Sequence, residues 1–408
     1  MTQFRKPGRA GTVDLPQPGE DALRHSRQLE ALIQEEINDS GGRISFRRFM
    51  ERALYTPGLG YYQAGARKFG EAGDFVTAPE ISPLFARCLA EQCRQVLSDL
   101  DGERVIVEFG AGSGALAVDL LAALECQNVL PDRYLILEPS ADLQQRQYQR
   151  VQETVPHLLE RVSWLRDLQG ESWCGVVIAN EVLDAMPVHR LAFDGKDVQE
   201  CYVELEKGRF VWRLDQLSCV ELQTAVSHIR RYLDDAVMPS PYVTEVNLAG
   251  EAWIKTLSQH LQQGVALLID YGFNASAYYH PQRDQGTLMC HYRHRFHDDP
   301  FKLVGLQDIT AHVDFTAMAE SAYQSGLRVA GYNTQAHFLL TTGLTQFLEH
   351  TDGDENENNI VHRSKLAQEV KKLTHPEEMG ELFKVLAVAK AYDEPLTGFQ
   401  LQDLRGRL

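Results

Sequence analysis

The stretch Val107–Leu116 reads VEFGAGSGAL and contains three glycines in alternation. It lies between an apolar run and an apolar segment of helical character. Glycines in this pattern let backbone approach a nucleotide closely. The same letters satisfy the dinucleotide pattern G-x-G-x-x-G/A, and a tight turn without any ligand would also use glycine. The loop alone therefore leaves three interpretations open.

A carboxylate just before the loop favours one of them. Glu108 precedes Gly110 by two residues and, with Gly112 and Gly114, completes the pattern E-x-G-x-G-x-G. A carboxylate at this point repels a dinucleotide pyrophosphate, but it attracts a cationic amino-acid ligand. S-adenosylmethionine carries an ammonium and a sulfonium and no phosphate. We therefore expect it as the cofactor, bound by Glu108 and the three glycines.

Further candidates follow the next two apolar runs. Glu138 ends the run LILEPS, where it can accept both ribose hydroxyls, a role that NAD sites share. Asp167 and Leu168 follow the run VSWL, from which a side chain can reach the adenine edge. A surface carboxylate at Glu138 and a turn cap at Asp167 are the structural alternatives.

An acidic motif, NEVLD, marks the candidate acceptor side. Glu181 and Asp184 are three residues apart, so on one helical turn they would face the same cleft. We expect both to be catalytic and Asn180 to touch the cofactor. Asp270 ends the run GVALLID at the same sheet edge and is the third catalytic candidate. The alternatives are caps for the motif and a loop anchor for Asp270.

Two more polar segments complete the predicted site. In GDFVTAPEIS we expect Asp74, Thr77, Pro79 and Glu80 to close over the methionine end of the cofactor, unless the segment is a purely structural turn.

In DITAHVDF, His312 and Asp314 either orient the substrate or cap the helix FTAMAESAYQ. Cys290 and the histidines at 291, 294 and 297 suggest zinc, but three-residue spacing on a strand points successive imidazoles to opposite faces. We expect no metal.

The elements that must position these residues alternate in α/β fashion. Apolar runs predict buried strands, and segments with helical periodicity separate them, which indicates a Rossmann-like, doubly wound parallel sheet. Predicted strands are 104–110, 134–140, 162–165, 175–182, 264–272 and one near 327–332; predicted helices include 21–39, 83–97, 115–124, 141–155 and 248–262. Residues 187–214 break the rhythm and predict an antiparallel insertion with turns at 194–195 and 207–208.

This pattern predicts four regions. They are a flexible tail (1–20), a helical cap with a cofactor-covering loop (21–100), a methyltransferase-like core (101–342) with an insertion near 187–247, and a C-terminal helical segment (343–408).

Composition limits the partners. The 408-residue chain has a formal charge of −17, which disfavours non-specific nucleic-acid binding and anionic membranes. Its seven cysteines are odd in number and form no C-x-x-C motif, so we expect reduced thiols and a cytoplasmic location. The polar first residues do not resemble a signal peptide. Whether the chain forms an oligomer stays open.

The chain resembles the MidA family of class I methyltransferases. The resemblance rests on motifs that stand in family order, from roughly residue 43 to 390: GDFVTAPEIS, EFGAGSGAL, NEVLDAMPVHR, GVALLIDYGF, DITAHVDF, QAHFLLTTG and PEEMGELFKVLAV. Ala111 departs from the family, which often has proline there. The resemblance implies a Rossmann-like sheet with added helices, an S-adenosylmethionine site and arginine of a protein partner as methyl acceptor.

Arginine's guanidinium is a planar cation whose donor fork fits paired carboxylates, so acidic side chains near the transferred methyl group suit it. A small-molecule acceptor and a non-catalytic assembly factor that binds the cofactor remain alternatives. The acidic pair favours an enzyme, and the antiparallel insertion favours a macromolecular acceptor.

Overall fold

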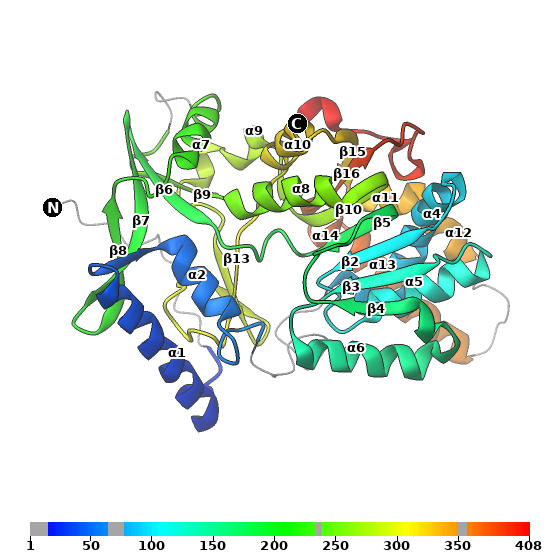
Figure 1. The fold of residues 1–408 in the computed structure, drawn as a ribbon, viewed down its shortest axis with the longest axis horizontal. Coiled ribbons are helices and arrows are strands. Elements are labelled where there is room, and N and C mark those ends of the chain that lie inside the picture. Colours follow the sequence, from blue (N-terminus) through cyan, green and yellow to red (C-terminus); the bar gives the residue numbers. More distant parts are fainter. Residues whose placement is uncertain (1–14, 64–76, 234–237, 350–356) are drawn as a thin grey trace. The chain divides into compact units, whose positions relative to one another are not determined.

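The computed structural model describes residues 15–63, 77–233, 238–349 and 357–408. The chain forms two compact units, each assembled from segments far apart in the sequence (Figure 1). We call Val76–Leu183, Glu251–Asn274 and Val313–Leu408 the parallel-sheet unit. The antiparallel unit consists of Met1–Phe75, Asp184–Gly250 and Ala275–His312.

One sheet organises the parallel-sheet unit, with strand order β15-β16-β10-β5-β2-β3-β4. Its strands are β2 (Val105–Phe109), β3 (Arg133–Leu137), β4 (Val162–Leu165), β5 (Trp173–Asn180), β10 (Leu261–Phe273), β15 (Arg328–Thr334) and β16 (Phe383–Lys390). The short strand β14 (Val313–Asp314) pairs in parallel with the end of β10. Neighbouring strands from β4 to β10 are parallel, whereas β16 is antiparallel to both β10 and β15.

The order of the strands locates the expected site. From β2 the chain continues to β3 and β4, and it then returns to place β5 on the other side of β2. The winding direction therefore reverses between β2 and β5. Doubly wound sheets bind ligands at the carboxyl ends of the strands that flank such a reversal. The predicted doubly wound α/β fold is confirmed.

Burial on both faces of the sheet explains why the strand sequences are apolar. All five residues of β2 are buried, as expected for a strand covered on both faces. In Figure 1, α8 runs above the parallel strands and α6 below them. The helices of this unit are α3 (Ala78–Ile81), α4 (Pro83–Asp99), α5 (Ala115–Cys126), α6 (Ala141–Thr154), α8 (Leu248–His260, its first residues in the other unit), α10 (Phe315–Gln324), α11 (Gln335–Thr341), α12 (Leu344–Glu349), α13 (Glu357–Thr374) and α14 (Met379–Leu382), with 3₁₀ turns at Pro156–Arg161, Thr397–Phe399 and Arg405–Arg407.

The C-terminal region corrects one prediction. Helices α12, α13 and α14 agree with the expected helical segment, but Phe383–Lys390 is a strand, β16, rather than a helix. It pairs with β10 on one side and β15 on the other, so it lies inside the sheet. Eight residues of apolar character fit a buried strand as well as two turns of buried helix, and only the pairing distinguishes them.

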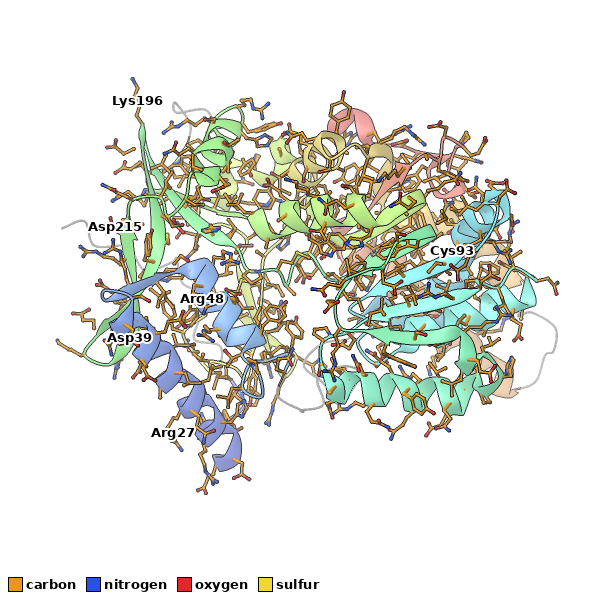
Figure 2. The ribbon with its side chains drawn as sticks, viewed as in Figure 1. Arg27, Asp39, Arg48, Cys93, Lys196 and Asp215 are labelled. Carbon is orange, nitrogen blue, oxygen red and sulfur yellow. The ribbon has the colours of Figure 1, made fainter. Side chains whose placement is uncertain are left out.

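The antiparallel unit contains the predicted insertion. Strands β6 (His189–Asp194), β7 (Asp197–Glu206) and β8 (Arg209–Asp215) form two hairpins whose turns fall at the predicted positions, and Lys196 marks the first turn in Figure 2. Strand β7 also pairs with β1 (Arg43–Ser45), and β6 pairs with β9 (Tyr242–Val246).

The remaining elements of this unit are α1 (Glu20–Asp39), α2 (Phe46–Tyr55), α7 (Glu221–Ile229), α9 (Ala275–Tyr278), a 3₁₀ turn at Pro281–Arg283, β11 (Met289–Tyr292), β12 (Arg295–His297) and β13 (Asp308–Thr310). Across both units, no helix within the described ranges is long and apolar enough to cross a membrane.

Candidate functional site

The glycine loop joins β2 to α5 and has a conformation that requires glycine. Gly110, Gly112 and Gly114 have φ angles of 64°, 54° and 81°, in the left-handed region that L-residues with a Cβ avoid. A Cβ on Gly114 would lie 3.3 Å from the Cα atom of Gln147, so this glycine also lets α6 pack closely on the loop. A Cβ on Gly110 would likewise lie 3.2 Å from a methyl carbon of Val182, so packing requires glycine at both ends of the loop.

Glu108 is a buried carboxylate on β2, beside the loop. The Tyr134 hydroxyl donates a hydrogen bond to its Oε2 at 2.7 Å. Burial raises the pKa of Glu108 to about 7, against the lowering effect of the Tyr134 hydrogen bond and with a smaller raising effect from Glu138. The group therefore titrates near neutral pH, and a cationic ligand beside it would favour its ionised form.

Glu138 follows β3 and is only 5% exposed, so the surface alternative for this carboxylate is wrong. The Ser140 backbone N–H donates to its Oε1 at 2.9 Å, and the Gln147 side-chain amide donates to its Oε2 at 3.3 Å. Both oxygens are thus held in a fixed orientation.

Gln147 was not among the predicted site residues. Its amide also donates to the Gly112 carbonyl oxygen at 2.9 Å and accepts from the Trp164 indole at 2.9 Å. The sequence holds a signal for it, because the buried residues of α6 are Leu143, Gln147 and Val151. Gln147 is therefore a polar residue within the apolar stripe of an amphipathic helix.

Glu80 lies on α3 and reaches the glycine loop. Its carboxylate accepts a hydrogen bond from the Ser113 hydroxyl and forms an ion pair with Arg150 at 3.2 Å. Arg150 also donates to the Ser113 hydroxyl at 2.5 Å. The structure thus brings Glu80 to the loop through two partners that the sequence did not identify, and its role over the methionine end of the cofactor stays a prediction.

The other predicted cofactor residues are less engaged. Thr77 precedes α3 as its N-cap without a side-chain hydrogen bond, and Pro79 lies in the first turn of that helix. Asp167 is exposed and accepts the backbone N–H two residues on, at 3.0 Å, which fits the turn alternative. Leu168 follows it and is half-buried. Asp74 lies outside the described residues.

The carboxyl end of β5 carries an unusual backbone conformation at Glu181, where φ is 53° although the residue is not glycine. The Glu181 N–H donates to the Ile269 carbonyl at 2.9 Å, and Asn180 Nδ2 donates to Glu181 Oε1 at 3.2 Å. Asn180 Oδ1 is buried and has no hydrogen-bond partner within the described part of the chain. The predicted helical turn over 181–184 is wrong, because this segment forms bends and turns instead.

Asp270 is buried in β10 and binds backbone. Its Oδ2 accepts the Leu183 N–H at 3.0 Å, and its Oδ1 accepts the Tyr271 N–H at 2.9 Å. These two bonds fit the alternative role of Asp270 as a loop anchor, since its carboxylate fixes the segment that follows Glu181. A direct role of Asp270 in catalysis stays a prediction.

The last three candidates divide between the units. In the antiparallel unit, the buried Asp184 accepts the Ala311 N–H through its carbonyl at 3.0 Å, and the His312 N–H donates to Thr287 Oγ1 at 3.1 Å. In the parallel-sheet unit, Asp314 Oδ1 caps α10 by accepting two N–H groups of its first turn, at 3.0 and 3.2 Å. The cap alternative therefore describes Asp314. The catalytic role of Asp184 and the substrate roles of His312 and Asp314 stay predictions.

The histidine-rich segment forms β11 and β12, where Cys290 pairs with His297 across the hairpin. Over the residues that the structure describes, no group of three or more His, Cys, Asp or Glu side chains could hold a metal ion.

The chemistry of this edge suits S-adenosylmethionine better than a dinucleotide. Around the left-handed glycine loop lie two buried carboxylates, Glu108 and Glu138, and the buried acceptor Asn180 Oδ1. Such acceptors match ribose hydroxyls and an ammonium, and the Glu108 carboxylate beside the loop would repel a pyrophosphate when ionised.

Comparison with known proteins supports this interpretation. Residues 88–333 match the family model described as S-adenosyl-L-methionine-dependent methyltransferase. A crystal structure from Burkholderia thailandensis, bound to S-adenosyl-homocysteine, is 44% identical with a TM-score of 0.89, covering 97% of this chain and 100% of that one. A second structure from that organism is 43% identical with a TM-score of 0.87, at the same coverage.

Curated relatives are more distant. The protein arginine methyltransferase NDUFAF7 homolog, mitochondrial, of Drosophila melanogaster is 28% identical over 398 residues, which cover 89% of this chain and 84% of the relative. The human protein arginine methyltransferase NDUFAF7, mitochondrial, is 28% identical over 384 residues, which cover 86% and 80% respectively.

Proposed function

The chain belongs to the S-adenosyl-L-methionine-dependent methyltransferase family, and we propose that it methylates an arginine side chain of a partner protein. Its cofactor is S-adenosyl-L-methionine, in agreement with the S-adenosyl-homocysteine bound to the similar Burkholderia structure. The names of the curated relatives support arginine as the acceptor, since these proteins align with this chain over 80% or more of their own length.

In the proposed site the glycine loop binds the backbone of the cofactor. Glu108 accepts hydrogen bonds from the ammonium of the methionine end, and Glu138 accepts hydrogen bonds from the ribose hydroxyls. Glu80 holds the loop through Ser113. The bound cofactor supplies the methyl group on its sulfonium, and the residues of this chain orient the two reactants, which accounts for most of the rate in such transfers.

The observation that carries the acceptor assignment is the left-handed conformation of Glu181, beside the reversal between β2 and β5. Non-glycine residues in this region are strained and persist where the surroundings fix them, which occurs often at functional sites. Here the Ile269 carbonyl accepts the N–H of Glu181 itself, and the Asp270 carboxylate accepts the N–H of Leu183, two residues on. We assign two roles to Glu181. Its carboxylate accepts hydrogen bonds from the guanidinium of the acceptor arginine, and it takes up the proton that the guanidinium nitrogen loses on methylation.

The proposal is tested by incubating the protein with S-adenosylmethionine labelled in the methyl group and an extract of its source cells. We expect label in the protein fraction. Label confined to small molecules would favour a small-molecule acceptor. No label in any fraction, with normal S-adenosylhomocysteine binding, would favour the non-catalytic assembly factor.

We further propose a cytoplasmic location, which the seven free cysteine thiols support. The curated relatives are named as mitochondrial proteins, so fractionation of source cells with an antibody to this chain is the direct test.

A further inference from the structure

Gln147 is completely buried in α6, and its hydrogen bonds define the orientation of its amide. The Trp164 indole N–H can only donate, so the atom that faces it must be the amide oxygen. The amide nitrogen then faces the Gly112 carbonyl and the Glu138 carboxylate, both of which can only accept. No other assignment of this amide satisfies its three partners.

The backbone of Gln147 lies close to the glycine loop. A Cβ on Gly114 would lie 3.3 Å from both Cα and Cγ of Gln147, so the lack of a side chain at Gly114 lets α6 pack closely on the loop. The Gln147 side chain, which donates to both the Gly112 carbonyl and the Glu138 carboxylate, therefore links the glycine loop to Glu138.

We propose that Gln147 is a positioning residue for cofactor recognition. It connects the glycine loop to the Glu138 carboxylate, which binds the ribose hydroxyls. The Ser140 N–H and the Gln147 amide each donate to one oxygen of Glu138, so these two bonds together orient the carboxylate. A carboxylate prepared in this way loses less conformational entropy when the ribose binds. This inference rests on the ribose role of Glu138 in the proposed function.

The test compares binding of S-adenosylhomocysteine with that of its 2′-deoxy analogue by titration calorimetry. Gln147→Glu keeps an acceptor for Trp164 but places an oxygen where the amide donated to Gly112 and Glu138. Trp164→Phe is the matched control, because it removes the bond on the other side of the same amide and leaves both donated bonds intact.

We expect the parent protein to prefer S-adenosylhomocysteine over the deoxy analogue by about tenfold or more. In Gln147→Glu that preference should fall below roughly threefold, whereas Trp164→Phe should retain it. If Gln147→Glu does not fold, the double variant Gln147→Met/Trp164→Phe replaces both partners of the indole bond by apolar groups and should show the same loss of preference.

A purely structural role for Gln147 predicts a different result. Both ligands would then weaken by the same factor in Gln147→Glu, with the parental preference unchanged, and this would overturn the inference. A parent protein without any preference would instead refute the ribose role of Glu138, and with it the premise of the inference.

Discussion

Replacing Glu181 by glycine should slow turnover strongly while changing the stability of the fold little. The left-handed backbone of Glu181 costs about 1–2 kcal/mol, which glycine relieves, whereas the greater freedom of glycine in the unfolded chain takes back about 0.4–1 kcal/mol. The lost hydrogen bond from Asn180, at 3.2 Å on a half-buried side chain, removes about 0.5–1 kcal/mol more. The free energy of unfolding should therefore stay within about 1 kcal/mol of the parent's.

Turnover should respond very differently. Loss of a charged hydrogen bond to the acceptor guanidinium costs about 2–5 kcal/mol, which corresponds to a rate lower by roughly 30-fold or more. Denaturant unfolding gives the stability, calorimetry gives the affinity for S-adenosylhomocysteine, and label transfer to the acceptor fraction gives the rate. Glu181→Gln, which keeps the side-chain size and removes the charge, should lose a similar factor in rate.

Lys207→Gly is the matched control for the backbone change. Lys207 has a φ of 51° in the turn between β7 and β8, so glycine relieves the same strain there. This variant should keep the parental rate. Full turnover in a folded Glu181→Gly protein would refute the assignment of Glu181 to catalysis, and a weaker cofactor affinity with an unchanged rate would place Glu181 against the cofactor instead.

Three further results are expected. Calorimetry should show that the affinity for S-adenosylhomocysteine rises with pH until about 7, by up to about tenfold per pH unit. The reason is that burial keeps Glu108 protonated below that pH, whereas an ammonium ligand needs the ionised carboxylate. A pH dependence in Glu108→Gln as steep as that of the parent protein would contradict this. Asp314→Ala should lower the free energy of unfolding by about 1 kcal/mol in urea while turnover per folded molecule stays unchanged, since it removes the cap of α10; reduced turnover would favour a substrate role. Asp270→Asn should lower the free energy of unfolding by about 1–3 kcal/mol in the same urea measurement, because the new amide NH2 group cannot accept from the buried N–H of Leu183. Parental stability would argue against the anchor role of Asp270.

The sequence was informative where local pattern decides structure. Apolar runs predicted the parallel strands, and because parallel strands end at one sheet edge, the residues after them were expected to gather there. Glu108, Glu138 and Asn180 do stand at the ends of β2, β3 and β5. The sequence offered a helix cap as one of two roles for Asp314, because an aspartate directly before a helical pattern favours a cap.

Other features depend on contacts that no local pattern records. Strand β16 is an apolar octet whose identity comes from pairing with β10 and β15, far away in the sequence. The left-handed backbone at Glu181 depends on the carbonyl of Ile269 and cannot be inferred from the motif NEVLD. The apolar stripe of α6 marks Gln147 as a buried polar residue, but its partners follow from the packing of α6 on the glycine loop, which no local pattern records.

The central claim is that this chain transfers a methyl group from S-adenosylmethionine to arginine, and amino-acid analysis of the labelled product tests it most directly. The labelled protein fraction is hydrolysed in acid, and its amino acids are separated beside methylated arginine and methylated lysine standards. We predict that the label migrates with methylated arginine and that Glu181→Gln reduces it by roughly 30-fold or more at saturating cofactor. Label in any other amino acid, or equal labelling by a folded Glu181→Gln protein, would contradict the account.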